Sequence, residues 1–435
     1  MLKNPLKETI ELNRNGQNRG LYSVCSANEI VLRAAIRHAV KHSYPLIIES
    51  TSNQVNQEGG YTGMRPNEFM TWVRKIAREE NMGEENLILG GDHLGPIIWQ
   101  NECEGPAMEK AAEMVKAYTL AGFSKIHLDT SMKLSGDPPG TRNQGELDPR
   151  ICARRGAFLA KTVYESFAGM PEGSRRPALI IGSEVPIPGG SQEHEDTVVP
   201  TRPEHFLEQV SIFREEFSRE GIDFNDVAAF VVQPGVEFGD DFVYFYNPEK
   251  AAALIGALKK VPGLVFEGHS TDYQGRENLA RLVKDGVAIL KVGPGLTFAL
   301  REGLLLLEAI EEIITPSVSR SRFKKTLLDE MNSSKKYWEK YYSGSPEEIE
   351  YKKLFSYSDR CRYYFPAVNV RKSMESLISN IPAVPPALLS QFFPAQYQRF
   401  MAGELGNDPL SVLYDRIGEV CGDYASACGL IVHNS

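Results

Sequence analysis

The sequence of 435 residues lacks the features that define membrane, secreted and disulfide-stabilised proteins. No apolar stretch reaches the roughly 18 residues that a membrane-spanning helix needs. The N-terminal stretch MLKNPLKETIELNRNGQNRG contains no apolar core of a signal peptide. The six cysteines are scattered and form no CxxC pair, which argues against a disulfide framework and against a zinc knot. These absences predict a cytoplasmic protein whose cysteines are reduced and mostly buried.

A basic surface and nucleotide-binding motifs are also missing. The formal net charge of -9 argues against nonspecific binding of nucleic acid, which requires a basic surface. No P-loop motif (GxxxxGKS or GxxxxGKT) occurs, and the first apolar run ends in CSANE rather than in a glycine-rich turn. The sequence therefore predicts neither a kinase nor a nucleotide cofactor. Anionic small molecules stay open as substrates, because local charge decides their binding.

Eight short apolar runs alternate with amphipathic segments over most of the chain. Near-continuous apolar strands separated by helices are typical of a parallel sheet with helices on its faces. The number of runs and the chain length predict a (β/α)8 barrel over residues 1–315, and an open doubly wound sheet is the alternative. The runs occupy residues 20–27, 45–51, 87–93, 125–131, 178–185, 228–235, 264–270 and 287–294.

The alternation of strands and helices stops near residue 316. Residues 316–435 are helix-rich and aromatic, and the prolines of IPAVPPALLSQFFPAQ should interrupt their helices. We expect a helical extension that packs on the barrel and offers a contact surface for a homo-oligomer.

The C-terminal ends of the predicted strands are polar. Enzymes with this barrel build their active sites from such strand ends, whereas apolar layers fill the rest of the barrel interior. A single polar end could be a satisfied core group, but their recurrence at one level predicts a functional site. The polar residues at or just after the strand ends are Glu49, Ser50, Thr51, Asn53, Asp92, His93, His127, Asp129, Glu184, Gln233, Glu267, His269 and Lys291.

Imidazoles and carboxylates in this set predict a site for a divalent metal. Histidine combined with Asp or Glu suits Zn2+, whereas a set richer in oxygen favours Mn2+ or Mg2+, so the metal stays open. His93 and His269 are the candidate imidazoles, and His127 is either a further ligand or a supporting core residue. The candidate carboxylates are Asp92, Asp129, Glu184 and Glu267.

The segments after the seventh and eighth strands predict a phosphate site. They read GHSTDYQGR and KVGPGLTFALRE, and loops at these places in such barrels often bind phosphate through backbone N–H groups. Gly293 and Gly295 would allow close approach, unless this segment merely turns the chain. A second phosphate would need another basic cluster, for which Lys133, Arg142 and Arg301 are candidates. The residues expected to contact substrate are Glu49, Asn53, Gln233, Glu267, Ser270, Thr271, Asp272, Lys291, Gly293 and Gly295.

Eight stretches are distinctive enough to compare with a known family: YSVCSAN, STSNQVNQEGGYTGMRP, LGGDHLGP, GFSKIHLDTSM, GSEVPIPGG, VVQPGVEFG, EGHSTDYQ and LKVGPGLTFALRE. They closely resemble the GatZ/KbaZ family, the D-tagatose-1,6-bisphosphate aldolase subunits that have long been described as non-catalytic. The similarity extends from about residue 5 to beyond residue 400 and includes SDRCRYYFP in the extension.

The resemblance implies residue roles, because the GatZ/KbaZ family is itself distantly similar to the zinc-dependent class II aldolases. Asp92 lies where those aldolases have their general acid/base, and His93 and His269 lie where they have metal ligands. Where they have a further ligand histidine, at the end of the sixth strand, this chain has Gln233. That departure leaves room for Glu184 to complete a different set of metal ligands.

The resemblance also implies two alternative functions. Some members are understood as D-tagatose 6-phosphate 4-epimerases, which interconvert this sugar with D-fructose 6-phosphate. Retro-aldol cleavage between C3 and C4 would need a metal, a base and a phosphate anchor. In this interpretation Asp92 or Glu184 transfers the protons, and Asp129 or Glu267 supports the metal-binding histidines. The alternative is a non-catalytic subunit that stabilises a separate catalytic aldolase.

Overall fold

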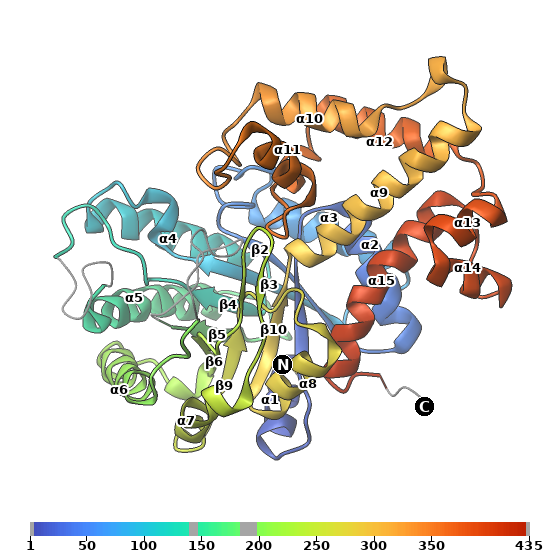
Figure 1. The fold of residues 1–435 in the computed structure, drawn as a ribbon. Coiled ribbons are helices and arrows are strands. Elements are labelled where there is room, and N and C mark those ends of the chain that lie inside the picture. The colour runs from blue at the N-terminus through green and yellow to red at the C-terminus, as the bar shows by residue number, and fades with distance from the viewer. Residues whose placement is uncertain (1–3, 139–146, 183–197, 432–435) are drawn as a thin grey trace.

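The computed structural model describes residues 4–138, 147–182 and 198–431. Within them, eight parallel strands close into a barrel in the order β1-β10-β9-β6-β5-β4-β3-β2, which confirms the predicted (β/α)8 barrel and excludes the open sheet (Figure 1). Each predicted apolar run overlaps one of these strands. They are β1 (Leu21–Cys25), β2 (Leu46–Thr51), β3 (Leu87–Leu94), β4 (Lys125–Leu128), β5 (Ala178–Ile181), β6 (Val227–Val232), β9 (Val265–Gly268) and β10 (Val287–Val292).

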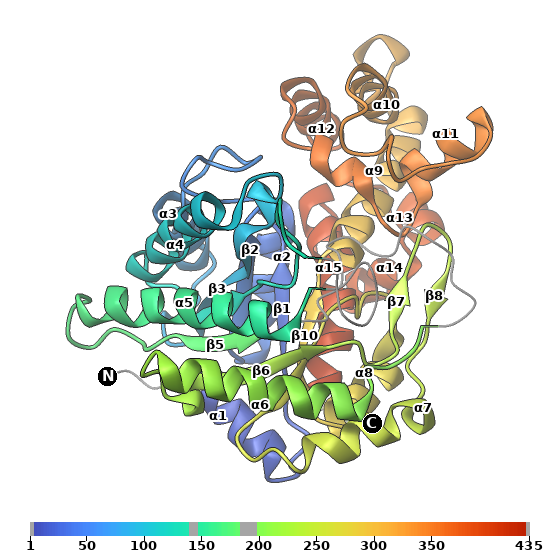
Figure 2. The same ribbon diagram turned by 90° about the vertical axis from the view of Figure 1, so that its left-hand side faces the viewer.

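A helix follows each strand and packs on the outside of the barrel (Figure 2). Asn28 and Asn247 begin two of these helices by accepting hydrogen bonds from their first backbone N–H groups. The helices are α2 (Glu29–His42), α3 (Pro66–Glu79), α4 (Glu104–Leu120), α5 (Pro149–Ala168), α6 (Pro203–Arg219), α7 (Pro248–Leu258), α8 (Gly275–Lys284) and α9 (Pro294–Ile314). The connections also contain the short helices η1 (Pro96–Trp99) and η2 (Phe224–Asp226), and the hairpin of β7 (Glu237–Phe238) and β8 (Val243–Tyr244).

The first helix, α1 (Pro5–Arg14), closes the end of the barrel from which the strands begin. Its Leu6 and Ile10 are buried in one cluster with side chains of the barrel interior, among them Leu21, Ile47 and Ile88. These three residues lie in the first half of β1, β2 and β3. Apolar packing therefore fills this half of the barrel, and the polar groups gather in the other half.

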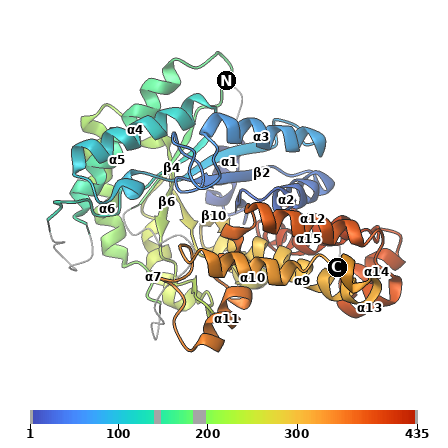
Figure 3. The same cartoon turned by 90° about the horizontal axis from the view of Figure 1, so that it is seen from above.

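After α9 the chain forms a helical extension on one side of the barrel (Figures 1 and 3). Two of its helices, α13 and α14, begin at prolines of the stretch that was predicted to interrupt helices. The boundary at residue 315 between two units stays a prediction. The extension comprises η3 (Ser317–Ser319), α10 (Phe323–Ser333), α11 (Pro346–Phe355), η4 (Arg360–Tyr364), α12 (Val368–Asn380), α13 (Pro386–Phe392), α14 (Pro394–Met401) and α15 (Pro409–Ala427).

The last helix, α15, returns to the barrel and packs against α2, α8 and α9. Just beyond it, the carbonyl oxygen of Cys428 accepts a hydrogen bond from the N–H of Gly20, which precedes β1. The end of the extension therefore packs against the outer helices of the barrel. In the described ranges, no helix is both long and apolar enough to cross a membrane.

Candidate active site

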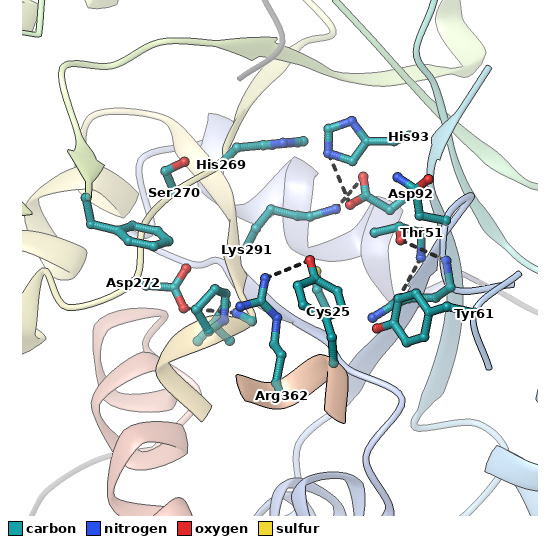
Figure 4. Close-up of a pocket in the computed structure, with 17 residues that line it drawn as sticks. Cys25, Thr51, Tyr61, Asp92, His93, His269, Ser270, Asp272, Lys291 and Arg362 are labelled. Atoms are coloured by element: carbon teal, nitrogen blue, oxygen red, sulfur yellow. Dashed lines mark hydrogen bonds and ion pairs between the residues drawn. The ribbon is translucent and has the colours of Figure 1, made fainter. Parts of the chain in front are cut away.

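The polar strand ends meet at the carboxyl end of the barrel, around a pocket of about 110 Å³ (Figure 4). The barrel lines the pocket with Asp92, His93, His269 and Lys291, and the extension contributes Arg362. The other lining residues that the sequence predicted to contact substrate are Asn53, Ser270, Asp272 and Gly293.

Two lysines lie among the carboxylates of the strand ends. Lys125, on β4, places its Nζ 2.5 Å from Oε1 of Glu49 and 2.7 Å from Oε2 of Glu267, and all three side chains are fully buried. Lys291, on β10, contacts Glu49 and lies 2.6 Å from Oδ1 of Asp92. Burial alone would lower the pKa of each lysine, but the surrounding carboxylates raise it above its usual value. Both lysines are therefore cations at neutral pH.

The segment GGDHLGP at the end of β3 needs two of its glycines because neighbouring groups occupy the space beside them. A Cβ atom on Gly90 would collide with the side chain of Glu49, and one on Gly95 would overlap the backbone carbonyl oxygen of Asp129. The backbone of β3 can therefore approach its two neighbouring strands closely. This approach carries the acid and the histidine between these glycines into the mouth of the barrel.

Asp92 is buried and ionised. Its Oδ1 contacts Lys291 and lies 2.8 Å from Nδ1 of His127, and its Oδ2 lies 3.6 Å from Nε2 of His93. Burial alone would raise the pKa of Asp92, but His93, Lys291 and His127 together hold it well below its usual value. At neutral pH this side chain is therefore a carboxylate, in the form that can accept a proton.

His93 is held in a defined orientation by its backbone and by a second carboxylate. Its φ of 50° is uncommon for a residue other than glycine, and its backbone N lies 3.3 Å from Nδ1 of His127. Its Nδ1 lies 2.8 Å from Oδ2 of Asp129, and Asp129 also accepts two hydrogen bonds from Ser131. Carboxylates in this position orient imidazoles that bind metals or transfer protons. Asp129 therefore supports His93 and leaves Nε2 on the side of Asp92.

Three imidazoles lie close together in the site. The ring centroids of His93, His127 and His269 are 5.1–5.3 Å apart. Nε2 of His127 is buried and has no hydrogen-bond partner within the described part of the chain. Nε2 of His269 lies 3.1 Å from Oε1 of Glu267, and burial lowers the pKa of His269 to about 4. His269 is therefore neutral at physiological pH, which is the form that binds a metal.

The donor set in the barrel mouth fits a divalent metal. One ligand atom from each of Asp92, His127, Glu267 and His269 lies within 4.8 Å of the others. Two imidazoles and two carboxylates suit Zn2+ or Mn2+, and the unpartnered Nε2 of His127 is a buried group that a cation would satisfy. The structure thus brings the predicted Asp92, Glu267 and His269 together. It adds His127, for which the sequence left two interpretations.

The loop that was predicted to bind phosphate has an internal partner. Oδ1 of Asp272 accepts hydrogen bonds from the backbone N–H groups of Gly293, at 3.0 Å, and Gly295, at 2.7 Å. Burial raises the pKa of Asp272 to about 6. Ser270 lines the pocket, whereas the hydroxyl of Thr271 donates to the carbonyl oxygen of Lys291 at 2.6 Å. Asp272 therefore already occupies the two N–H groups that a phosphate would use.

Other predicted residues lie elsewhere. Oε1 of Gln233 accepts hydrogen bonds from the N–H groups of Gly235 and Val236, both at 2.9 Å, so this side chain closes a turn after β6. Arg301 is buried and pairs with Asp359 of the extension. Glu184 and Arg142, which the sequence offered as a ligand or proton-transfer group and as a basic residue, lie outside the described residues.

Comparison with known proteins now decides the family. A model of the family described as D-tagatose-1,6-bisphosphate aldolase subunit GatZ/KbaZ-like matches residues 6–429. The chain belongs to this family. It is 43% identical over 428 residues to the D-tagatose-1,6-bisphosphate aldolase subunit GatZ of Salmonella gallinarum (strain 287/91 / NCTC 13346), in a match that covers 97% of this chain and 99% of the relative. The GatZ subunit of Klebsiella pneumoniae is 42% identical with the same coverage.

A solved structure agrees with the family. The crystal structure of a "probable tagatose 6 phosphate kinase" from Sinorhizobium meliloti 1021 superposes with a TM-score of 0.85 at 40% sequence identity. The match covers 94% of this chain and 100% of that one. The similarity to this solved structure therefore includes both the barrel and most of the extension.

Two residues of this GatZ/KbaZ-like site were missed from the sequence. Lys125 stands two positions before His127 on β4, so both side chains point into the barrel, and a lysine inside an apolar run was the available signal. Arg362 belongs to the distinctive stretch SDRCRYYFP, but nothing in its spacing placed that stretch over the barrel mouth.

Proposed function

We propose that the chain is a metal-dependent ketose-phosphate 4-epimerase that interconverts D-tagatose 6-phosphate and D-fructose 6-phosphate. The observation that carries the proposal is the group of Asp92, His127, Glu267 and His269 at the carboxyl end of the barrel, beside the Lys291 cation. Membership of a tagatose-bisphosphate aldolase family supports a phosphorylated ketose as the substrate.

Inversion at C4 of a 2-ketose needs more than enolisation, because the hydrogen on C4 is not adjacent to the carbonyl group. Reversible aldol cleavage avoids this difficulty. A base takes the proton of the C4 hydroxyl, the C3–C4 bond breaks, and its electron pair moves onto the ketone fragment while C4 becomes an aldehyde. After the aldehyde rotates, the same steps in reverse rebuild the bond on the opposite face.

Asp92 is our candidate for the base, because it is ionised and faces the pocket. His127, Glu267 and His269 would hold the divalent cation, which would supply Lewis-acid stabilisation of the negative charge on the ketone fragment. Lys291 adds a fixed positive charge beside Asp92. Fixed charges that need no rearrangement during the reaction are an effective source of catalysis.

His93 is our candidate for the proton donor when the bond forms again. Burial lowers its pKa, but Asp92 and Asp129 outweigh burial and raise it. The ring can therefore carry a proton near neutral pH and is held with Nε2 toward Asp92. Glu184 stays the other predicted proton-transfer group.

The test begins with the purified chain alone. Mn2+, Mg2+ or Zn2+ is added in turn with D-fructose 6-phosphate, and formation of D-tagatose 6-phosphate is followed by NMR. We expect conversion that needs the metal and stops on chelation. Asp92→Asn should lower the rate by at least about 100-fold, the scale of a lost general acid/base. Asp329→Asn, an exposed change on α10, is the matched control and should keep the full rate.

Full activity of Asp92→Asn would contradict the mechanism, and absence of conversion with every metal would contradict the epimerase function. The relatives' description as aldolase subunits then favours the second candidate, a subunit that stabilises a separate catalytic aldolase. That function predicts no turnover by the chain alone. It also predicts that the chain raises the thermal stability or the activity of the aldolase with which it purifies.

A further inference from the structure

We propose that Arg362, delivered by the helical extension, binds the anionic end of the substrate in this pocket. The inference rests on the proposed function for the nature of the ligand, a sugar phosphate. It assigns phosphate recognition to the extension rather than to the loop after the eighth strand. The case depends on how Arg362 is positioned, on which of its N–H groups are engaged, and on the contacts that Lys291 and the loop after the eighth strand already make.

The short helix η4 is fixed to the barrel immediately before Arg362. Oδ1 of Asp359 lies 2.8 Å from Nε of Arg301, and its Oδ2 accepts a hydrogen bond of 2.7 Å from the hydroxyl of Thr297. Both partners belong to α9, the helix that starts at the pocket. This buried ion pair therefore fixes the position of η4 relative to the mouth of the barrel.

The side chains that flank Arg362 on η4 are held by other groups of the extension and the barrel. Arg360 donates to the carbonyl oxygen of Tyr337 at 3.0 Å and stacks over the ring of Tyr341. Tyr363 packs its ring against Tyr61 of the barrel. With its neighbours held, Arg362 reaches from η4 toward Asp272 and Lys291 in the pocket (Figure 4).

Arg362 keeps part of its hydrogen-bonding capacity for a ligand. Its Nη1 donates to the carbonyl oxygens of Ser358 and Asp359, and its Nη2 donates to the hydroxyl of Tyr363 at 3.0 Å. A guanidinium group has five N–H donors. Within the described residues, Nε–H and one N–H of Nη2 have no partner, and no carboxylate forms an ion pair with Arg362. A buried cation that faces a pocket and keeps unused N–H donors is the arrangement that binds an anion.

The other donors at this end of the pocket are already engaged. Asp272 occupies the backbone N–H groups of Gly293 and Gly295, and a phosphate would have to displace that carboxylate to use them. Lys291 is held by Asp92 and Glu49. Among the described residues that line the pocket, Arg362 is therefore the cation that remains for a terminal phosphate, and the reacting carbons would then lie toward His93 and His269 on the opposite side (Figure 4).

The experiment measures binding and turnover separately. The affinities of the metal-loaded full chain for D-fructose 6-phosphate and for D-fructose are measured by calorimetry, and epimerisation of the phosphorylated sugar is measured by NMR. We expect Arg362→Met to weaken binding of D-fructose 6-phosphate by about 10- to 100-fold, the range for hydrogen bonds to a charged group. Binding of D-fructose should stay as in the wild type. Arg362→Lys keeps the positive charge but not the planar guanidinium group. Its affinity for D-fructose 6-phosphate should therefore lie between those of the wild type and Arg362→Met.

Arg371→Met is the matched control, because this exposed arginine on α12 lies outside the pocket and should leave both affinities unchanged. Circular dichroism and the melting temperature check the fold, and Arg362→Lys serves as the test if the methionine variant does not fold. Unchanged binding of D-fructose 6-phosphate by the Arg362 variants would overturn the inference, as would equal affinity of the wild type for the two sugars. A wild type that binds the phosphorylated sugar through Arg362 without epimerising it would refute the proposed function alone.

Discussion

Lys291 and Asp92 meet at 2.6 Å, although only 5% and 2% of their surfaces are exposed. The same ammonium group also contacts Glu49. One buried cation therefore contacts two carboxylates, and one of these is the proposed base. This arrangement links the stability of the barrel mouth to the protonation state of the site.

Replacement of Lys291 should affect both the stability of the chain and the protonation of Asp92. We expect Lys291→Met to lower the free energy of unfolding by about 3–5 kcal/mol, because it leaves the buried carboxylate of Asp92 without its lysine partner. Loss of the positive charge should raise the pKa of Asp92. The acid limb of the epimerase pH profile should then move to higher pH, because a higher pKa means that protonation inactivates the base earlier as the pH falls.

Urea denaturation at pH 7 and a pH–rate profile check this prediction. Lys325→Met is the control, because Lys325 is exposed on α10 and pairs with Asp329 at the surface. It should change the unfolding free energy by less than about 1 kcal/mol. An acid limb that stays in place in Lys291→Met would show that Lys291 does not control Asp92.

The hydrogen bond between Asp129 and His93 predicts an effect on proton transfer. We expect Asp129→Asn to lower the rate of epimerisation by about 10- to 100-fold while the fold is retained, because the carboxylate orients the imidazole that we propose as the proton donor. NMR of the phosphorylated sugars measures the rate. Ser131→Ala removes only the hydroxyl hydrogen bond to Asp129 and should have a smaller effect. Equal rates of wild type and Asp129→Asn would exclude a supporting role for this carboxylate.

Alanine at a glycine of GGDHLGP should change the stability of the chain in the opposite direction from alanine at a glycine within a helix. Gly95→Ala should destabilise the chain by several kcal/mol and abolish activity, because its Cβ would overlap the carbonyl oxygen of Asp129 and the backbone cannot yield cheaply. Gly105→Ala, in α4, meets no atom within 4 Å and should stabilise the chain by about 0.4–1 kcal/mol. Thermal unfolding of the two variants compares them directly. Similar melting temperatures would contradict the assigned geometry of β3.

A buried carboxyl beside the pocket predicts a pH-dependent change in stability. Burial raises the pKa of Glu237 to about 7, and the nearby charge of Asp272 adds to the rise, whereas hydrogen bonds from Phe238 and Ser270 oppose it. The folded chain therefore holds this proton more tightly than the unfolded chain does. The stability that depends on it is intact below about pH 4.5 and is lost as the pH rises to about 7.

Glu237→Gln should remove this dependence. The variant should match the wild type at pH 4 and exceed its unfolding free energy at pH 8 by about 1–3 kcal/mol, according to the size of the pKa shift. Melting temperatures across this range provide the measurement. Glu113→Gln, an exposed change on α4, should leave the wild-type profile unaltered. A variant whose advantage is the same at pH 4 and pH 8 would refute the explanation.

The barrel could be predicted because each strand is an apolar run with a polar end. Asp92 and His269 could be recognised as site residues for the same reason, since strand ends converge in a parallel barrel whatever the details of packing. His127 stayed ambiguous because position on a strand gives its direction but not its partners. Its contact with Asp92, and the lack of a hydrogen-bond partner for Nε2 among the described residues, depend on the register between β3 and β4.

Other parts of the site depend on contacts that a local pattern does not contain. The sequence GPG after β10 predicts accessible N–H groups, but their partner Asp272 lies about twenty residues earlier. The side chain of Gln233 follows a strand, yet it turns back to its own loop. Arg362 enters the pocket because Asp359 pairs with Arg301, 58 residues away in the chain. Such pairings arise only when the extension has packed.

The return of α15 to the barrel has a consequence for synthesis and for truncation. Because this helix covers α2, α8 and α9, a nascent chain that has released all eight strands still exposes apolar helix faces until residues 409–427 have left the ribosome. The barrel therefore cannot complete its folding before α15 has been synthesised. We expect C-terminally shortened chains to aggregate rather than to yield a smaller working enzyme. Tags and fusion partners should be added at the ends of the chain, and α15 should not be deleted.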